Sequence, residues 1–198
     1  MTHLTPLQRQ VLELTYRNKL SHLSSTLSAA PIIEMIYRIK HPDDAFVLSQ
    51  GHAALALYCV LGRGQELLDK HGCQPHRAVE DGIYCSTGSL GMGITVALGM
   101  AMAGRPVHCL ISDGECAEGS VWEALRFVDR YRDFRLYVNF NGMSALGKVD
   151  DALIYSLRSF APFVRIIRSD PIDLPFTRGL EAHYHVITDA EWEGYDRP

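Results

Sequence analysis

Features that would place this protein in several common functional classes are missing from its sequence. A basic excess is absent, because 19 lysines and arginines stand against 23 aspartates and glutamates, for a net charge of -4. Surfaces that bind nucleic acid usually carry such an excess, so we expect no nucleic-acid partner. Long hydrophobic runs are absent too. The apolar tract over residues 53–61 is far too short to cross a bilayer, and we expect no membrane partner.

Signals of secretion are also lacking. Residues 1–10 contain no basic region followed by an apolar stretch, so we expect no signal peptide. The five cysteines are an odd number and show neither a disulfide framework nor the spacing of metal ligands. Reduced thiols and a cytoplasmic location are therefore expected.

The composition that remains fits one globular α/β domain over residues 1–198. Helical patterns cover residues 6–20, 29–39, 90–103 and 118–131. Short apolar runs typical of buried strands cover residues 45–48, 106–111, 136–140 and 164–167. This alternation predicts a parallel sheet flanked by helices on both faces. Residues 21–28 are small and polar and predict a loop, and a further helix is expected to begin near His52.

Distinctive polar residues follow the predicted strands. Ligands of parallel sheets bind beyond the carboxyl ends of the strands. Asp113 follows one buried strand and Asn141 ends the next. An acid and an amide at neighbouring strand ends can converge on one hard cation such as Mg²⁺. Both residue types are also common in turns, so this pair alone leaves a purely structural role open.

The surrounding residues resemble the thiamine-diphosphate motif of transketolases, which begins Gly-Asp-Gly and ends in a pair of asparagines. Residues 112–114 read Ser-Asp-Gly and residues 139–142 read Asn-Phe-Asn-Gly, and both departures spare the metal-binding positions. The resemblance implies that Asp113, the Asn141 side chain and the Met143 carbonyl hold Mg²⁺, which would bridge the cofactor's diphosphate.

Three more residues after the strand match the same pattern. Gly114 allows a sharp turn beside the ligand. The resemblance adds Glu118 and Glu123 to the cofactor-binding set and places Glu123 at a subunit interface. Acids are also favourable near a helix N-terminus, which is an alternative reason for both glutamates.

Two segments earlier in the chain resemble transketolase in the family's order. Residues 46–53 resemble its strand-and-histidine motif, which assigns the diphosphate contact to His52. Residues 87–93 resemble its glycine-rich turn, which places Gly88 and Leu90 against the aminopyrimidine side of thiamine diphosphate.

Three histidines resemble the catalytic histidines of the family. His22 matches the first active-site histidine, although serine replaces the usual glycine after it. His76 matches a histidine that contacts the sugar's hydroxyls, and His183 matches one near the end of the cofactor domain. Any one of them alone would be read as an ordinary surface or core histidine. Their occurrence together and in order favours the catalytic interpretation.

The resemblance, which covers nearly the whole chain, implies the thiamine-diphosphate-binding subunit of a two-component transketolase-like enzyme. Such an enzyme moves a two-carbon unit from a ketose, such as a ketose phosphate. In the family the activating glutamate belongs to a separate domain, so we expect a pyrimidine-binding partner subunit. Self-association within a heterotetramer is also expected, through apolar surface on residues 90–103 and 122–127.

Two alternatives remain open. The segment after Asp150 is shorter than in the family and shows no helix-rich stretch. A shorter, more open channel would suit transfer of the two-carbon unit to a lipoyl group or an acyl carrier protein in a biosynthetic pathway. A non-catalytic scaffold is the other alternative, and the intact Asp113, Asn141, His52 and His183 argue against it.

Overall fold

A four-stranded parallel sheet forms the centre of the computed structural model, which describes residues 4–169, 172, 174–177 and 181–195. The strands lie in the order β1-β2-β3-β6. Their bounds are Ala45–Leu48, Val107–Ser112, Phe134–Phe140 and Arg165–Arg168. In register, Leu48 lies opposite Leu110 and Ser112 opposite Asn139, so the carboxyl ends of β1, β2 and β3 meet at one edge.

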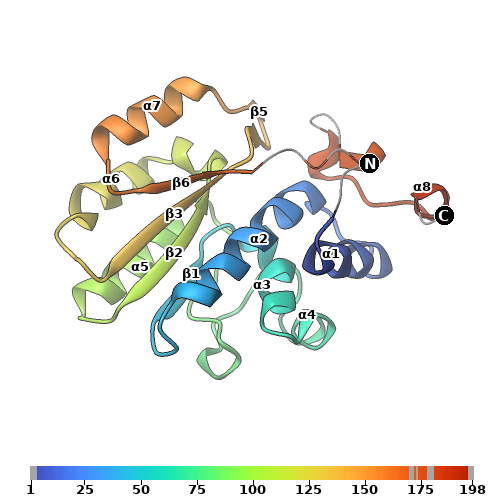
Figure 1. Cartoon of the computed structure of the whole chain (residues 1–198), viewed down its shortest axis with the longest axis horizontal. Helices are drawn as coiled ribbons and strands as arrows, with labels where there is room; N and C mark the ends of the chain where they lie inside the picture. Colours follow the sequence, from blue (N-terminus) through green and yellow to red (C-terminus); the bar gives the residue numbers. More distant parts are fainter. Residues whose placement is uncertain (1–3, 170–171, 173, 178–180, 196–198) are drawn as a thin grey trace.

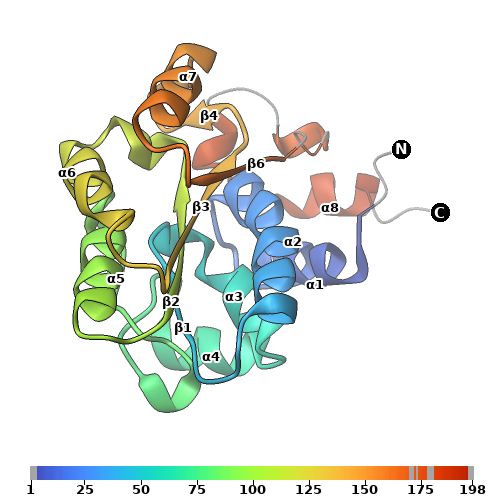
Figure 2. The same cartoon turned by 60° about the vertical axis from the view of Figure 1, so that its left-hand side comes forward.

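Helices cover both faces of the sheet (Figures 1 and 2), as the sequence predicts. One face carries α1 (Pro6–Arg17), α2 (Leu23–Ile39), α3 (Ala54–Val60) and α4 (Gly64–His71). The other carries α5 (Met92–Met102), α6 (Gly119–Val128) and α7 (Asp151–Phe160). Alternation along β1 explains the two cores: Phe46 and Leu48 join the first, and Ala45 and Val47 join the second. No helix in the described ranges is long and apolar enough to cross a membrane.

The first turns of α2 correct the prediction of a loop over residues 21–28. The helix begins at Leu23, and Leu23 and Leu27 are both buried in the first core. They are four residues apart, so they lie on one face of the helix. Burial of that face outweighs the modest helix propensity of the serines between them.

Gln8 compensates for a proline inside α2. Pro31 has no N–H to donate to the Leu27 carbonyl four residues earlier. The Gln8 side chain donates to that carbonyl instead, at 3.0 Å, and Gln8 is itself buried. Gln8 also forms a capping box with Thr5 at the start of α1. The Gln8 side chain therefore caps the start of α1 and completes the backbone hydrogen bonding of α2.

The C-terminal third of the chain contains more structure than the sequence predicts. Helix α7 connects β3 to β6 and buries Ile154 and Leu157. A short hairpin of β4 (Met143–Ser144) and β5 (Gly147–Lys148) precedes it. Helix α8 (Asp189–Tyr195) and the 3-10 turns η4 (Pro175–Thr177) and η5 (Glu181–His183) follow β6.

The role of Gln8 gives a stability prediction. Gln8→Met keeps the volume but leaves the buried Leu27 carbonyl without a donor, which costs about 1–3 kcal/mol, and it also removes the acceptor of the Thr5 N–H in the capping box. We expect a loss of about 2 kcal/mol in the free energy of unfolding, measured by urea denaturation. Gln10→Met, on the exposed side of the same helix, is the control and should change it by less than about 0.5 kcal/mol. Equal effects of the two substitutions would contradict this account.

Candidate active site

Asp113 and Asn141 meet at the carboxyl edge of the sheet. Asp113 is 1% exposed, and its Oδ2 accepts the Gly142 N–H at 2.7 Å while Oδ1 accepts the Gly114 N–H at 3.0 Å. Asn141 Oδ1 accepts the Met143 N–H at 2.9 Å. Burial raises the pKa of Asp113 to about 6, against the lowering effect of its backbone hydrogen bonds. A carboxylate and an amide thus share one turn at the end of two neighbouring strands.

This arrangement fits a hard cation and a larger ligand. An ionised carboxylate has about four acceptor positions and an amide oxygen has two, so Asp113 and Asn141 both retain acceptor capacity. Oxygen ligands of this kind suit Mg²⁺. Nearby elements also carry buried polar atoms without a hydrogen-bond partner in the described part of the chain: Ser24 Oγ, both amide atoms of Gln50, and Thr87 Oγ1. Such groups are costly to bury unpaired, and a bound polar molecule would relieve that cost.

His22, His52 and His183 form a cluster of rings. The His22 centroid lies 5.2 Å from that of His52 and 4.6 Å from that of His183. Tyr184 packs edge-on against His22 at 5.4 Å and against His183 at 4.7 Å. The backbone N–H of His22 donates to the backbone carbonyl of His183 at 3.0 Å, and this bond joins η5 to the start of α2. Three residues far apart in sequence therefore share one site.

The environment keeps these rings neutral. His22 has φ 63°, a left-handed conformation that is uncommon outside glycine and often found at functional sites. Burial, followed by repulsion from the other two rings, lowers the pKa of His52 to about 4. Burial also lowers the pKa of His22 and of His183. A neutral imidazole has a ring nitrogen with a free lone pair, which is the starting state that a general base needs, although the lowered pKa of His52 makes that ring a weak base at pH 7.

A cavity of about 190 Å³ opens beside His22 and His52. Its walls come from α1, the connection from α1 to α2, α2, the loop of His52, α3 and the segment after α4: Thr15, Lys19, Leu20, Ser21, His22, Thr26, His52, Leu55, Cys73 and Gln74. Lys19 is the one lysine or arginine among these lining residues, and Lys19 Nζ is held by Asp189 of α8 at 2.5 Å. The hydroxyl, imidazole and ammonium groups can hydrogen-bond a small polar ligand, and Leu20 and Leu55 add apolar wall.

Glycines allow the glycine-rich turn to pack against the end of β1. A Cβ on Gly51 would lie 2.6 Å from the Thr87 carbonyl oxygen, and one on Gly93 would lie 2.6 Å from the Ser49 Cα. Gly88 is half-buried and similarly close to Gln74. No larger residue fits these positions without displacing backbone or neighbouring side chains. The turn bearing Leu90 therefore lies directly beside the loop bearing His52.

Glu115, which the sequence motifs do not single out, is 0% exposed. Its carboxylate accepts hydrogen bonds from Ser49, Gly91 and Ser112. Burial raises the pKa of Glu115, and these hydrogen bonds oppose the rise. The Ser112 Oγ accepts the Glu115 N–H in return, as in a capping box, so the Ser-x-x-Glu spacing is a usable signal.

Four other predicted residues lie outside the histidine cluster. His76 is exposed and makes no ring contact with the three clustered histidines in the described ranges. Leu90 is 39% exposed. Glu118 is exposed at the start of α6, close to Gly91. Glu123 is exposed and pairs with Arg126 at 3.0 Å. Their assigned roles stay predictions.

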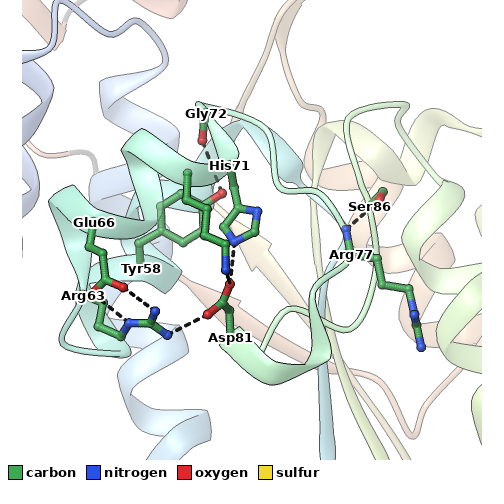
Figure 3. Close-up of polar contacts among 9 residues, drawn as sticks. Tyr58, Arg63, Glu66, His71, Gly72, Arg77, Asp81 and Ser86 are labelled. Atoms are coloured by element: carbon green, nitrogen blue, oxygen red, sulfur yellow. Dashed lines mark hydrogen bonds and ion pairs between the residues drawn. The ribbon is translucent and has the colours of Figure 1, made fainter.

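A buried acid anchors the segment that carries Cys73, Gln74 and His76. Asp81, in η2 (Val79–Asp81), has a side chain 5% exposed. Figure 3 shows Arg63 and His71 directed at its carboxylate, with distances of 2.9 and 2.8 Å. Lys70 Nζ is also 2.6 Å from it, and these contacts hold the pKa of Asp81 well below its usual range. The network ties the cavity-lining segment to helix α4.

Comparison with known proteins identifies the family. The family model for 1-deoxy-D-xylulose-5-phosphate synthase matches residues 1–161. The chain belongs to this family. The resemblance to transketolases is confirmed as well: the chain is 38% identical to the transketolase of Pongo abelii and 37% identical to that of Homo sapiens, each over 162 residues. These matches cover 66% of this chain and 25% of each transketolase, so the chain spans about a quarter of those relatives.

Two further similarities are informative. The chain is 32% identical over 152 residues to one subunit of the apulose-4-phosphate transketolase of Phocaeicola vulgatus, covering 63% of this chain and 54% of that protein. The crystal structure of the transketolase mutant H261F from Pichia stipitis superposes with a TM-score of 0.63 at 21% identity. That match covers 78% of this chain and 29% of the transketolase and supports the fold.

The low pKa of His52 gives a pH prediction. The unfolded pKa of about 6.5 exceeds the folded value of about 4, so protons favour the unfolded chain. The resulting stability is present above pH 6.5 and lost as the pH falls toward 4, by at most about 1.4 kcal/mol per pH unit. We compare the unfolding free energies of the wild type and of His52→Gln. The difference, wild type minus variant, is expected to decrease as the pH is lowered from 6.5 to 4. The subtraction cancels the opposite contribution of Asp113, whose pKa is raised.

Urea denaturation at several pH values measures this difference. His41→Gln, at an exposed histidine outside the cluster, is the matched control. If the wild-type and His52→Gln stability curves run parallel from neutral pH to pH 4, the ring of His52 is not held neutral by its surroundings.

Proposed function

We propose that this chain is the diphosphate-binding subunit of a thiamine-diphosphate-dependent, two-component transketolase-like enzyme. The observation that carries the proposal is a juxtaposition at one edge of the sheet. The turn of Asp113 and Asn141 and the loop of His52 both leave the carboxyl ends of neighbouring strands. Membership of the family and the two-thirds of the chain that align with transketolases support it.

The proposed cofactor site is built from groups suited to a magnesium diphosphate. Asp113, the Asn141 side chain and the Met143 carbonyl are proposed to hold Mg²⁺, with His52 and Gly114 beside the diphosphate. Gly88, Leu90, Glu118 and Glu123 are proposed to complete the cofactor side of the site. Bound thiamine diphosphate supplies the nucleophilic carbon and the electron sink that allow a carbon–carbon bond of the donor to break.

The chain's own residues are proposed to bind the substrate and move protons. His22 lines the cavity, and His183 packs against the His22 ring. Both imidazoles are neutral at pH 7, so either can accept a proton from a hydroxyl of a ketose or ketose phosphate. Lys19 and the surrounding hydroxyls suit a polyhydroxylated, anionic substrate. His76, which is exposed on the segment after α4, is proposed to contact the hydroxyls of the substrate.

A pyrimidine-binding partner subunit is part of the proposal. The name of the relative from Phocaeicola vulgatus describes it as one subunit of its transketolase, which supports a division of this enzyme type between chains. Helix α5 and the turn before it also present exposed apolar side chains: Leu90, Met92, Val96 and Met102. Exposed apolar surface of this kind is typical of an interface, which suits self-association within a heterotetramer.

Metal binding gives the first test of the proposed function. We expect Asp113→Ala or Asn141→Ala to weaken Mg²⁺-dependent binding of thiamine diphosphate by about 100-fold, since removal even of supporting residues costs about 10–100-fold in metal affinity. Calorimetry measures the affinity, and circular dichroism checks that the fold survives. Asp43→Ala, at an acid that is 92% exposed, is the control. Wild-type affinity in both site variants would remove the metal assignment.

Dependence on a partner is tested by exchange of the cofactor's C2 proton, followed by NMR. The chain alone, saturated with thiamine diphosphate and Mg²⁺, is expected to leave the exchange rate at that of free cofactor. Addition of the pyrimidine-binding partner should accelerate it, because the activating glutamate is proposed to reside there. Fast exchange from a preparation shown to contain this chain alone would refute the two-component proposal.

The assembled pair should then be assayed with ketose donors against aldehyde acceptors, a lipoyl carrier and an acyl carrier protein. Product formed only on an aldehyde supports a sugar transketolase. Product formed only on a carrier supports the alternative acceptor class.

A further inference from the structure

Glu115 is the least exposed acid in the described residues, and the proposed function gives it no role. It lies in η3 (Gly114–Ala117), directly after β2. No lysine, arginine or histidine pairs with it in the ranges that the structure describes. A carboxylate in such a place is expensive unless its acceptor positions are used. Its role therefore has to be sought in the hydrogen bonds that it accepts.

Each carboxylate oxygen of Glu115 accepts two hydrogen bonds. Oε1 accepts Ser49 Oγ at 2.5 Å and the Gly91 N–H at 3.0 Å. Oε2 accepts the Ser112 N–H at 2.8 Å and is 3.3 Å from Ser112 Oγ. Each oxygen thus faces one backbone N–H, and a backbone N–H can only donate. The site requires an acceptor on both arms of the side chain.

Each of the three donor residues lies next to a different segment of the proposed cofactor site. Ser49 follows β1 and leads to His52. Gly91 closes the glycine-rich turn after Leu90. Ser112 ends β2 and precedes Asp113. One carboxylate therefore joins three segments that converge on the carboxyl edge of the sheet.

We propose that Glu115 is a positioning residue that fixes the His52 loop, the Leu90 turn and the Asp113 loop relative to one another. It acts through the backbone that carries the groups proposed to bind the cofactor. The proposal rests on the proposed function only for its consequence in cofactor binding. Its structural content concerns the chain by itself and can be measured without a ligand.

Glu115→Gln is the sharpest variant. It keeps the shape of the side chain but replaces one acceptor with an NH₂ group, which must face either Gly91 N–H or Ser112 N–H. One backbone donor then loses its partner. Val128→Ala is the control, because Val128 is buried in α6 and its truncation lowers stability without touching these loops.

Amide hydrogen exchange on the full chain gives the first readout. The Gly91 and Ser112 amides report the direct bonds. The amides of Gly142, which donates to Asp113, and of Ala53, beside His52, report the relayed effect. Relative to the Cys109 amide in the middle of β2, we expect exchange about tenfold faster at these sites in Glu115→Gln, as for a lost bond of about 1.4 kcal/mol. Val128→Ala should leave the ratios unchanged.

Unchanged ratios at Gly142 and Ala53 in Glu115→Gln would overturn the proposal. Equal changes in Glu115→Gln and Val128→Ala would overturn it as well, since the effect would then be general loss of stability.

Calorimetry with thiamine diphosphate and Mg²⁺ gives the second readout. We expect Glu115→Gln to raise the Kd about tenfold, an effect of about 1.4 kcal/mol, with part of the affinity recovered at higher Mg²⁺. Val128→Ala, the control for general loss of stability, should leave the Kd unchanged. Wild-type affinity in the variant would overturn the consequence for cofactor binding. Failure of the wild-type chain to bind at all would count against the proposed function, and the exchange ratios would still decide the role of Glu115.

Ser49→Ala keeps the proposal testable if Glu115→Gln does not fold. It removes the one hydroxyl donor to Oε1 and leaves the Gly91 bond in place. We expect exchange at Ala53 to rise about threefold relative to Cys109, as for a net loss of about 0.5–1 kcal/mol. No change at Ala53 in this variant would also overturn the proposal.

Discussion

The close approach of backbone to backbone at the carboxyl edge of the sheet is the constraint on which the site depends. Gly51 meets the Thr87 carbonyl and Gly93 meets Ser49, at distances that leave no room for a side chain. These contacts place the glycine-rich turn of residues 87–93 directly against the end of β1. The Glu115 carboxylate bonds to the same two segments and to the end of β2. Shape and hydrogen bonding thus specify one arrangement together, and each would be weaker alone.

Burial and hydrogen bonds set the pKa values of the acids and histidines at this edge. Asp113 and Glu115 are both buried, accept N–H and O–H donors, and have raised pKa values because burial disfavours their charge. The clustered histidines are neutral for the same reason, with a lowered pKa. Asp81 is the contrast, because three basic side chains surround it and hold its pKa low. An acid held by a network of cations anchors a segment, whereas an acid with acceptor positions to spare can bind a cation.

How far the sequence predicts this structure depends on the range of the interactions involved. The sheet follows from short apolar runs, which are local signals, and it is confirmed. The start of α2 escapes prediction because burial of Leu23 and Leu27 against distant residues decides it. Helix α7 carries a local signal that the prediction did not use, because the buried Ile154 and Leu157 are three residues apart and lie on one helical face. A family motif indicates Asp113 and Asn141, whereas Glu115 lies outside that motif although its spacing from Ser112 carries a local signal.

The histidine cluster depends on contacts between residues 183–192 and the first two helices. His183 reaches His22 because the segment bearing it is held against α1 and the start of α2. The His22 N–H bonds the His183 carbonyl, and Trp192 of α8 stacks on Tyr16 with centroids 4.4 Å apart. Asp189 accepts from both Tyr16 and Lys19, and Lys19 also borders the cavity. Lys19 therefore belongs to two structures, the wall of the cavity and the attachment of α8.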